Sequence, residues 1–295
     1  MTWPNLPQDV IDWFRDCFRA ANEEVTAALD NVPNVRESSL DDRLVDALIP
    51  RSAPTRLPSD SIVSMQIHNI GGLRSLGRWE TADIALIVHV QIKGRPIAQK
   101  IGLLQSKRLY PYNTGIDELD PYDFYLGMNG LLLPEPKSAA RALYRDFTFR
   151  ESCRYRGYDA GQMKTVTQFN SKFGDAIYYL FYNPSRLPMR VKYPIESYSR
   201  AAVVALGCRV STAKEVATAA KRVRGSGGPT RKAVASNSKS SDWRLEQWAA
   251  DLLLTCKVGR EYDAADEEFV LRMVTRRSGP IGAAIRATID LGSEN

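Results

Sequence analysis

Two apolar, β-branched runs separated by a short polar break limit the folds open to this chain more than any other part of its sequence. Residues 84–90 and 97–104 have the composition of strands, and residues 94–96 (Gly-Arg-Pro) supply turn chemistry between them. Strands joined by so short a connection pair antiparallel. The sequence therefore predicts a hairpin, and polar residues adjoin both of its strands at the end away from the turn.

Three polar side chains stand at that end. Asp83 directly precedes the first run, and Gln105 and Lys107 lie at the end of the second. Because side chains alternate across a strand, Gln105 and Lys107 point to one face and Ser106 to the other. A two-residue turn beginning at Gly94 would place Asp83 opposite Ser106. A three-residue loop would place it opposite Gln105, and we expect that loop or a bulge of equal effect.

This trio has the chemistry for phosphodiester hydrolysis. The Asp83 carboxylate and an oxygen of Gln105 could hold Mg²⁺ (or Mn²⁺), because such a hard ion prefers a few oxygen ligands and keeps part of its hydration shell. Lys107 adds a compact positive charge that could stabilise developing negative charge or orient the attacking water. Each residue also has a structural explanation, with Asp83 as a polar strand start and Lys107 as a solvated charge at a strand end.

Asp83 followed by Gln105-Ser106-Lys107 resembles the motif of the PD-(D/E)xK, or restriction-endonuclease-like, superfamily, in the branch where glutamine replaces the acid before x-Lys. The resemblance spans residues 20–185. It implies an α/β fold with a restriction-endonuclease-like core, in which a central mixed sheet is flanked by helices. It also implies Mg²⁺-dependent cleavage of DNA, often as the cutting component of bacterial anti-phage defence or restriction systems. The chain departs from the motif in having no proline immediately before Asp83.

Two further acids are candidates for the site. An upstream helix in the family often carries another acid, and residues 36–48 are similar to it, with Glu37 as the best candidate. An acid at the start of a helix also suits the helix dipole and capping chemistry, so Glu37 has a structural explanation of equal weight. Glu80 is a rival acid that could assist the metal site. Asp83 ranks above it because Asp83 adjoins the apolar run, whereas Glu80 stands in a loop-like stretch.

Residues 1–200 are expected to form one nuclease-like domain. An insertion at about residues 108–161 interrupts it. Apolar periodicity, capping residues and prolines define its other elements. These are helices at residues 9–29, 39–49 and 162–173, and strands at residues 62–70 and 176–184.

The insertion interleaves tyrosines with arginines. Aromatic rings can stack on bases while arginines bind phosphates, so Arg154 and Arg156 are candidate nucleic-acid contacts. Alternatively, the tyrosines and prolines pack an irregular loop over the core.

Residues 201–241 are rich in Lys, Arg, Gly and Ser, and we expect them to form a flexible basic connection. Residues 211–224 within it could form a capped helix. The net charge of +6 and the pI of about 9.1 suit a polyanionic partner. Cations on the outer face of that helix could contact phosphates or could simply be solvated, and they are Lys221, Arg222 and Arg224.

Residues 242–295 are predicted to be a mostly helical extension. One helix begins at Asp242, a second covers residues 264–277, and residues 281–291 close the extension. The chain has no glycine-rich phosphate loop, so a motor or sensor activity would need a separate subunit. His89, in the middle of a predicted strand, is expected to be a hydrogen-bonded core or interface residue.

Cysteine spacing and apolar run length bear on the compartment. The four cysteines form no CxxC or Cys/His cluster, which favours reduced thiols in a cytoplasmic protein. No apolar stretch has the length of a membrane span, and no basic leader with an apolar core precedes the first helix. The expectation is a soluble cytoplasmic protein.

These patterns lead to three functional hypotheses. The first is a Mg²⁺-dependent DNA nuclease that uses Asp83, Gln105, Lys107 and Glu37. The second is a non-catalytic nucleic-acid-binding or partner-binding subunit that keeps a nuclease fold, since the neutral Gln105 weakens metal affinity. The third is an inhibitor or scaffold whose basic tract binds an acidic protein surface.

Overall fold

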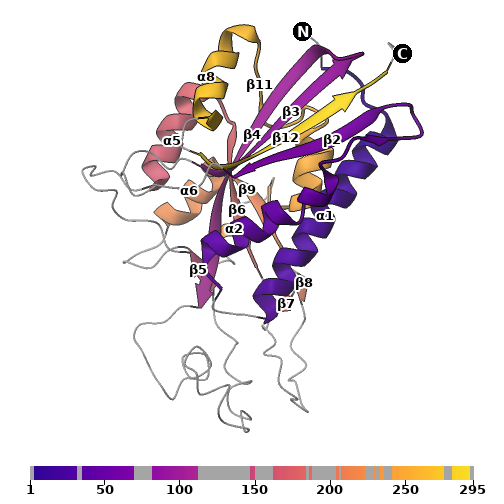
Figure 1. Ribbon diagram of the computed structural model, residues 1–295. Coiled ribbons are helices and arrows are strands. Elements are labelled where there is room, and N and C mark those ends of the chain that lie inside the picture. The colour runs from indigo at the N-terminus through magenta and orange to yellow at the C-terminus, as the bar shows by residue number, and fades with distance from the viewer. Residues whose placement is uncertain are drawn as a thin grey trace.

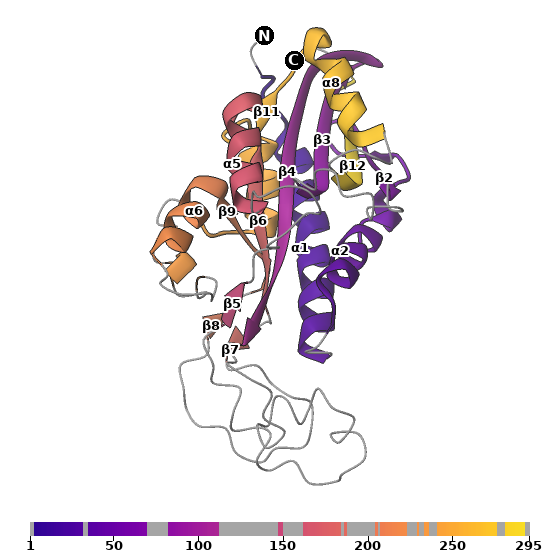
Figure 2. The same cartoon turned by 90° about the vertical axis from the view of Figure 1, so that its left-hand side faces the viewer.

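The computed structural model describes residues 3–31, 35–69, 82–111, 147–149, 162–183, 186–187, 204–205, 207–222, 229, 233–235, 241–275 and 281–292. These residues form an α/β fold around an open mixed sheet (Figure 1). Helices α1 and α2 lie on one side of this sheet, and α5 and α6 lie on the other (Figure 2). The predicted α/β class with a central mixed sheet is confirmed.

The described helices begin and end close to the predicted positions in the first two thirds of the chain. They are α1 (Gln8–Asn31), α2 (Glu37–Asp46), the 3₁₀ turn η1 (Ile49–Arg51), α5 (Gln162–Phe173), α6 (Ala213–Lys221), the π-helical η4 (Gln247–Leu253) and α8 (Ala264–Thr275). None of them is both long and apolar enough to cross a lipid bilayer.

The strands of the main sheet follow the order β1-β2-β12-β3-β4-β6-β9-β10, and β5 and β11 pair with β4. A separate pair is formed by β7 and β8. The strand bounds are β1 (Thr55–Arg56), β2 (Ile62–Asn69), β3 (Ala82–Ile92), β4 (Arg95–Pro111), β5 (Phe147–Phe149), β6 (Ile177–Tyr182), β7 (Arg186–Leu187), β8 (Val204–Ala205), β9 (Arg209–Thr212), β10 (Trp243–Arg244), β11 (Arg260–Glu261) and β12 (Ile281–Asp290).

The predicted hairpin is β3–β4. Its turn consists of two residues with left-handed backbone, Lys93 at φ 50° and Gly94 at φ 77°, as a two-residue hairpin turn requires. A bulge then leaves Ile97 as an extra residue in β4, and the register continues regularly to the far end of the hairpin. Extended by one residue, that register sets Asp83 opposite Gln105. The two-residue turn thus begins at Lys93, one residue before Gly94. Together with the bulge it gives the register expected from a three-residue loop, so the prediction of such a loop or an equivalent bulge is confirmed.

The closing segment at residues 281–291 is a strand, so its prediction as part of a helical extension is wrong. As β12 it lies between β2 and β3, antiparallel to the first and parallel to the second. Its alanines favour helix by intrinsic propensity, but Ala283, Ala284 and Ala287 are buried where β12 pairs with β2 and β3. The rest of the predicted extension is helical at η4, which begins after the short strand β10 rather than at Asp242, and at α8, while β11 is a further short strand.

The described part of the predicted flexible connection is ordered sheet and helix. Strand β9 pairs antiparallel with β6, and α6 follows it directly. Thr212 caps α6, because its Oγ1 accepts a hydrogen bond from the Glu215 N–H at 3.3 Å. Strand β9 therefore belongs to the same sheet as the hairpin, which corrects the prediction of a flexible connection there, whereas α6 confirms the capped helix predicted within residues 211–224.

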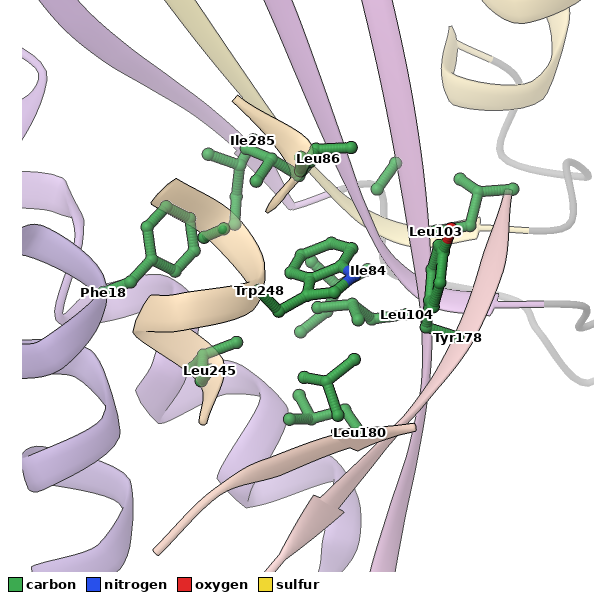
Figure 3. Close-up of a cluster of buried hydrophobic side chains, with 14 of the residues drawn as sticks. Phe18, Ile84, Leu86, Leu103, Leu104, Tyr178, Leu180, Leu245, Trp248 and Ile285 are labelled. Atoms are coloured by element: carbon green, nitrogen blue, oxygen red, sulfur yellow. The ribbon is translucent and has the colours of Figure 1, made fainter. Parts of the chain in front are cut away.

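The hydrophobic core packs η4 and α1 against this sheet (Figure 3). Trp248 of η4 is fully buried beside Tyr178 of β6, with ring centroids 5.5 Å apart. Its indole lies so close to the β4 backbone that a Cβ at Gly102 would come within 2.9 Å of the ring. Phe14 and Phe18 of α1 complete the layer, as their helical spacing predicts.

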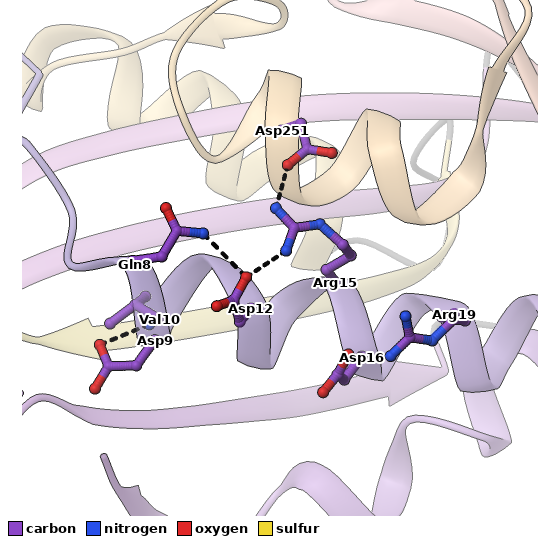
Figure 4. A network of polar contacts seen from close by, with 8 residues as sticks. All are labelled: Gln8, Asp9, Val10, Asp12, Arg15, Asp16, Arg19 and Asp251. Atoms are coloured by element: carbon purple, nitrogen blue, oxygen red, sulfur yellow. Dashed lines mark hydrogen bonds and ion pairs between the residues drawn. The ribbon is translucent and has the colours of Figure 1, made fainter. Parts of the chain in front are cut away.

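A polar network also joins α1 to η4 (Figure 4). Arg15 donates to Asp251 at 2.5 Å and also bonds Asp12, which accepts a hydrogen bond from Gln8 at 3.0 Å. These carboxylates raise the pKa of Arg15. Because the groups are partly exposed, the network fixes the orientation of η4 more than it adds stability.

The cysteines among the described residues are free thiols, as predicted. Cys17 and Cys208 are buried, and burial raises the pKa of Cys17 to about 11 and that of Cys208 to about 12. Cys256 is partly exposed, and Cys153 lies outside the described residues.

Candidate active site

The first half of the candidate site forms where the pairing of β3 with β4 ends. Beyond the pair Ile84–Leu104, β4 continues without β3. Oδ2 of Asp83 occupies this position and accepts hydrogen bonds from the Ser106 backbone N–H at 2.8 Å, from Ser106 Oγ at 2.9 Å and from Gln105 Nε2. The Asp83 carboxylate thus accepts the hydrogen bond from the β4 backbone N–H that a carbonyl of a neighbouring strand would otherwise accept.

The second half joins β4 to the first residue of α2. Nζ of Lys107 lies 3.1 Å from Oε1 of Glu37, and the backbone N–H of Arg108 donates to Oε2 of Glu37 at 2.6 Å. The Lys107 side chain is 3% exposed and that of Glu37 is 29% exposed. Both carboxylate oxygens of Glu37 therefore contact β4. If Glu37 only stabilised the start of α2 through the helix dipole, these contacts would not be needed.

Asp41, one turn further along α2, is a member of this cluster that the sequence reasoning missed. It is 7% exposed and accepts a hydrogen bond from the Tyr182 hydroxyl at 2.6 Å. The Tyr182 and Ser106 hydroxyls partly oppose the rise in the pKa of Asp41 that burial causes. The position of Asp41 four residues after Glu37, on the buried helix face with Leu44, is a signal that could have revealed it.

The electrostatics of the cluster are those of crowded carboxylates. Burial raises the pKa of Glu37, the Lys107 ammonium and the Arg108 N–H oppose this, and the Asp83 charge raises it further. Burial and then the Asp83 charge raise the pKa of Asp41 well above its ordinary value. The Asp83 charge thus disfavours ionisation of both Glu37 and Asp41, and a bound cation would relieve this effect.

An unsatisfied oxygen lies in the same place. Gln105 is 1% exposed, and its Oε1 is buried without a hydrogen-bond partner. An unmade hydrogen bond of this kind costs roughly 1–3 kcal/mol, so such an atom calls for a ligand.

Asp83 and Gln105 offer carboxylate and amide oxygens, which are the type of ligand that a divalent cation such as Mg²⁺ prefers. Across the described ranges, no group of three or more His, Cys, Asp or Glu side chains is placed to hold a metal. A cation here would rest on few protein oxygens and keep several waters, which suits Mg²⁺ better than ions that need a complete protein cage.

The structure thus brings together Asp83, Gln105, Lys107 and Glu37. The predicted Lys221 and Arg222 are exposed at the end of α6, on the other side of the sheet from α2 (Figure 2). His89 lies away from the cluster and hydrogen-bonds to the Tyr262 hydroxyl at 2.9 Å, as its position in a strand predicts. The remaining predicted site residues lie outside the described residues, and they are Glu80, Arg154, Arg156 and Arg224.

Comparison of the chain with protein-family models, with characterised proteins and with solved structures found no match.

Proposed function

We propose that this chain is a Mg²⁺-dependent nuclease that hydrolyses phosphodiester bonds of DNA on a restriction-endonuclease-like core. One observation carries the proposal. Elements α2, β3 and β4 bring the acids Glu37 and Asp83, the Gln105 amide and the Lys107 ammonium together at one buried end of the hairpin, and Oε1 of Gln105 has no hydrogen-bond partner there. Apart from the short β1 and β5, the order α2, β2, β3, β4, α5, β6 is also the order that the resemblance implies. Service in a bacterial anti-phage defence or restriction system, with a separate motor or sensor subunit, is part of the same proposal.

Each residue has a role that its contacts support. Asp83 and Gln105 would hold the cation through side-chain oxygens, and Glu37 offers a further oxygen. A bound divalent cation polarises a phosphate and lowers the pKa of its bound water. Lys107 would neutralise charge on the scissile phosphate, and its ion pair with Glu37 holds the ammonium in position before DNA binds.

Cleavage of supercoiled plasmid DNA tests this function. The wild-type chain should nick the plasmid with Mg²⁺ or Mn²⁺ and not with a chelator. Lys107→Ala should lower the rate about 100-fold or more, because the charge at the phosphate is lost. Lys257→Ala, at an exposed lysine remote in sequence from the cluster, is the matched control and should keep the wild-type rate. Metal-independent cleavage, or full activity of Lys107→Ala, would contradict the proposal.

A second function, that of a non-catalytic nucleic-acid-binding or partner-binding subunit, is favoured by a different aspect of the same contacts. Gln105 and Lys107 both already bind carboxylates, so the cluster is a nearly closed polar network that could serve the fold alone. In that case the wild type and Lys107→Ala would be equally inactive with either metal, while both still bind DNA.

A further inference from the structure

We propose that Cys256 and Lys100 form a site of oxidative modification, at which hydrogen peroxide converts the thiol and the amine into a covalent sulfur–nitrogen bond. Cys256 follows η4 and Lys100 lies in β4, so the two residues are 156 positions apart in sequence and are brought together by the fold. The site uses none of the residues of the candidate active site, and the inference does not depend on the proposed function.

The Lys100 ammonium is buried against the sulfur. Lys100 is 2% exposed, its Nζ donates a hydrogen bond to Cys256 Sγ at 2.9 Å, and Nζ also lies 5.5 Å from the centre of the Trp3 ring. A thiol and a ring face are weaker partners for a buried cation than a carboxylate is. Atoms that are about to react lie roughly 3–3.5 Å apart, so the nitrogen is within reach of the sulfur before any reaction.

Glu261 of β11 provides the third group of the site. Its backbone pairs with that of Lys100, and its Oε1 accepts a hydrogen bond from the Cys256 thiol at 2.8 Å. Burial and then the Glu261 carboxylate raise the pKa of Cys256, and Lys100 opposes this rise. The sulfur therefore holds its proton at neutral pH, and Glu261 is the base that can accept this proton when the sulfur reacts.

Cys256 is also the cysteine that a small oxidant can reach among the described residues. It is partly exposed, whereas Cys17 and Cys208 are buried. Its backbone is left-handed, with φ 63°, a conformation that residues with a Cβ rarely adopt and that is found more often at functional sites. Peroxide can thus approach a sulfur that already contacts an amine and a carboxylate.

The first step of the reaction oxidises the sulfur. The Cys256 sulfur attacks one oxygen of hydrogen peroxide, the thiol proton passes to the Glu261 carboxylate, and the O–O bond breaks. The departing hydroxide takes a proton from the Lys100 ammonium and leaves as water. Sulfur has then lost two electrons to peroxide and carries a hydroxyl group as a sulfenic acid, while Lys100 has become a neutral amine.

The second step links the two side chains. The neutral Lys100 amine attacks the sulfur, the S–N bond forms as the S–O bond breaks, and the hydroxyl leaves as water with the proton held by Glu261. The nitrogen then releases one proton to solvent. The linked pair has two hydrogens fewer than the thiol and the amine, and sulfenic acids are known to condense with backbone nitrogen in the same way.

Peptide mass spectrometry of the full chain after treatment with hydrogen peroxide tests the inference. Digestion without reductant should give a peptide pair that joins Lys100 to Cys256 and is two hydrogens lighter than its parts. Dithiothreitol should separate the pair, because its two thiols restore the original groups and form a disulfide. An unmodified Cys256, a Cys256 that gains oxygen without a link to Lys100, or a linked pair that retains oxygen would overturn the inference.

Two substitutions separate the roles of the partners. Lys100→Met keeps an unbranched side chain and removes the amine, so Cys256 should gain oxygen and form no link. Glu261→Gln keeps a hydrogen-bond acceptor beside the sulfur and removes the base, so it should slow the formation of the link about tenfold or more. Glu268→Gln, at an exposed acid of α8, is the matched control and should react at the wild-type rate.

The test does not depend on the buried substitution. If Lys100→Met does not fold, the wild-type peptide map and the rate in Glu261→Gln remain, and Glu261 is an exposed residue whose replacement leaves the core intact. An unchanged rate in Glu261→Gln would overturn the role of Glu261 as the base. A chain that forms the link and does not cleave DNA would contradict the proposed function and leave this inference standing.

Discussion

At the scale of single residues, Gln105 gives the site two properties at once. Its Nε2 donates to Asp83, so the amide stabilises that carboxylate without a cation. Its Oε1 is buried and unpaired, so it is ready for a positive partner. A glutamate in its place would repel Asp83 in the cation-free protein and attract a cation more strongly. Under the proposed function, Gln105 would therefore bind a cation more weakly than a glutamate would, while its amide stabilises the Asp83 carboxylate when no cation is bound.

The variant Gln105→Glu tests this exchange. In the presence of a chelator, the melting temperature should fall by about 2–6 °C, because a hydrogen bond becomes a repulsion worth roughly 1–3 kcal/mol. Saturating Mg²⁺ should raise the melting temperature of the variant more than that of the wild type. Thermal unfolding with and without Mg²⁺ measures both effects. A variant that melts at the wild-type temperature in chelator would show that Asp83 does not depend on the amide.

Gly102 illustrates how closely η4 approaches the sheet. An added Cβ would lie 2.9 Å from Trp248 Cζ2 and 3.0 Å from Leu253 Cδ1, in a core where neither side chain can move freely. Gly102→Ala should destabilise the protein by about 1–3 kcal/mol through overpacking, measured by urea unfolding. Gly94→Asn is the control, since asparagine tolerates left-handed backbone and a Cβ added at Gly94 would have no atom within 4 Å. An unchanged midpoint for Gly102→Ala would mean that η4 can shift.

At the scale of secondary-structure elements, the sequence predicted what depends on local signals. The ends of α5 and the register of the β3–β4 hairpin follow from periodicity and turn chemistry within a few residues. The strand β12 could not be predicted in this way, because its partners β2 and β3 lie about 200 residues earlier in the chain. The site divides likewise: Asp83, Gln105 and Lys107 belong to one local motif, whereas Asp41 lies outside that motif and its hydrogen bond to Tyr182 of β6 could not be predicted from local spacing.

His89 of β3 hydrogen-bonds to Tyr262, which follows β11, and the stability that His89 contributes should decrease at acidic pH. Burial, aided by the nearby Arg286 charge, lowers the pKa of His89 to about 4, while an unfolded histidine titrates near 6.5. Below pH 6.5 the unfolded chain therefore binds a proton that the folded chain refuses, so stability falls from about pH 6.5 to about pH 4. Above pH 6.5 this histidine contributes no pH dependence.

The substitution His89→Gln isolates this contribution. An amide can still hydrogen-bond to Tyr262 but does not titrate, so the variant should lose less stability than the wild type between pH 7 and pH 4.5. Urea unfolding at several pH values gives the difference in slope. Parallel curves for the two proteins would show that His89 is protonated equally in the folded and unfolded states.

At the scale of the whole molecule, β12 determines whether the described residues fold as one unit. It lies between β2 and β3 and buries Ile285 and Ile289, so the hairpin that carries Asp83 is attached to β2 through the last strand that the structure describes. A domain is stable by only about 5–15 kcal/mol, and the loss of a central strand removes more than that in buried apolar surface and hydrogen bonds. Truncation at this end should therefore act on the candidate site at a distance.

A chain that ends at Gly279 should lack a cooperative thermal transition and should not bind Mn²⁺, although it keeps Asp83, Gln105, Lys107, Glu37 and Asp41. A chain that ends at Gly292 keeps β12 and should unfold and bind metal as the full chain does. Circular dichroism during heating and Mn²⁺ titration compare the two. If the shorter chain still unfolds cooperatively and binds Mn²⁺, then β2, β3 and β4 form a stable sheet without β12. The core of the sheet would in that case fold independently of residues 281–292.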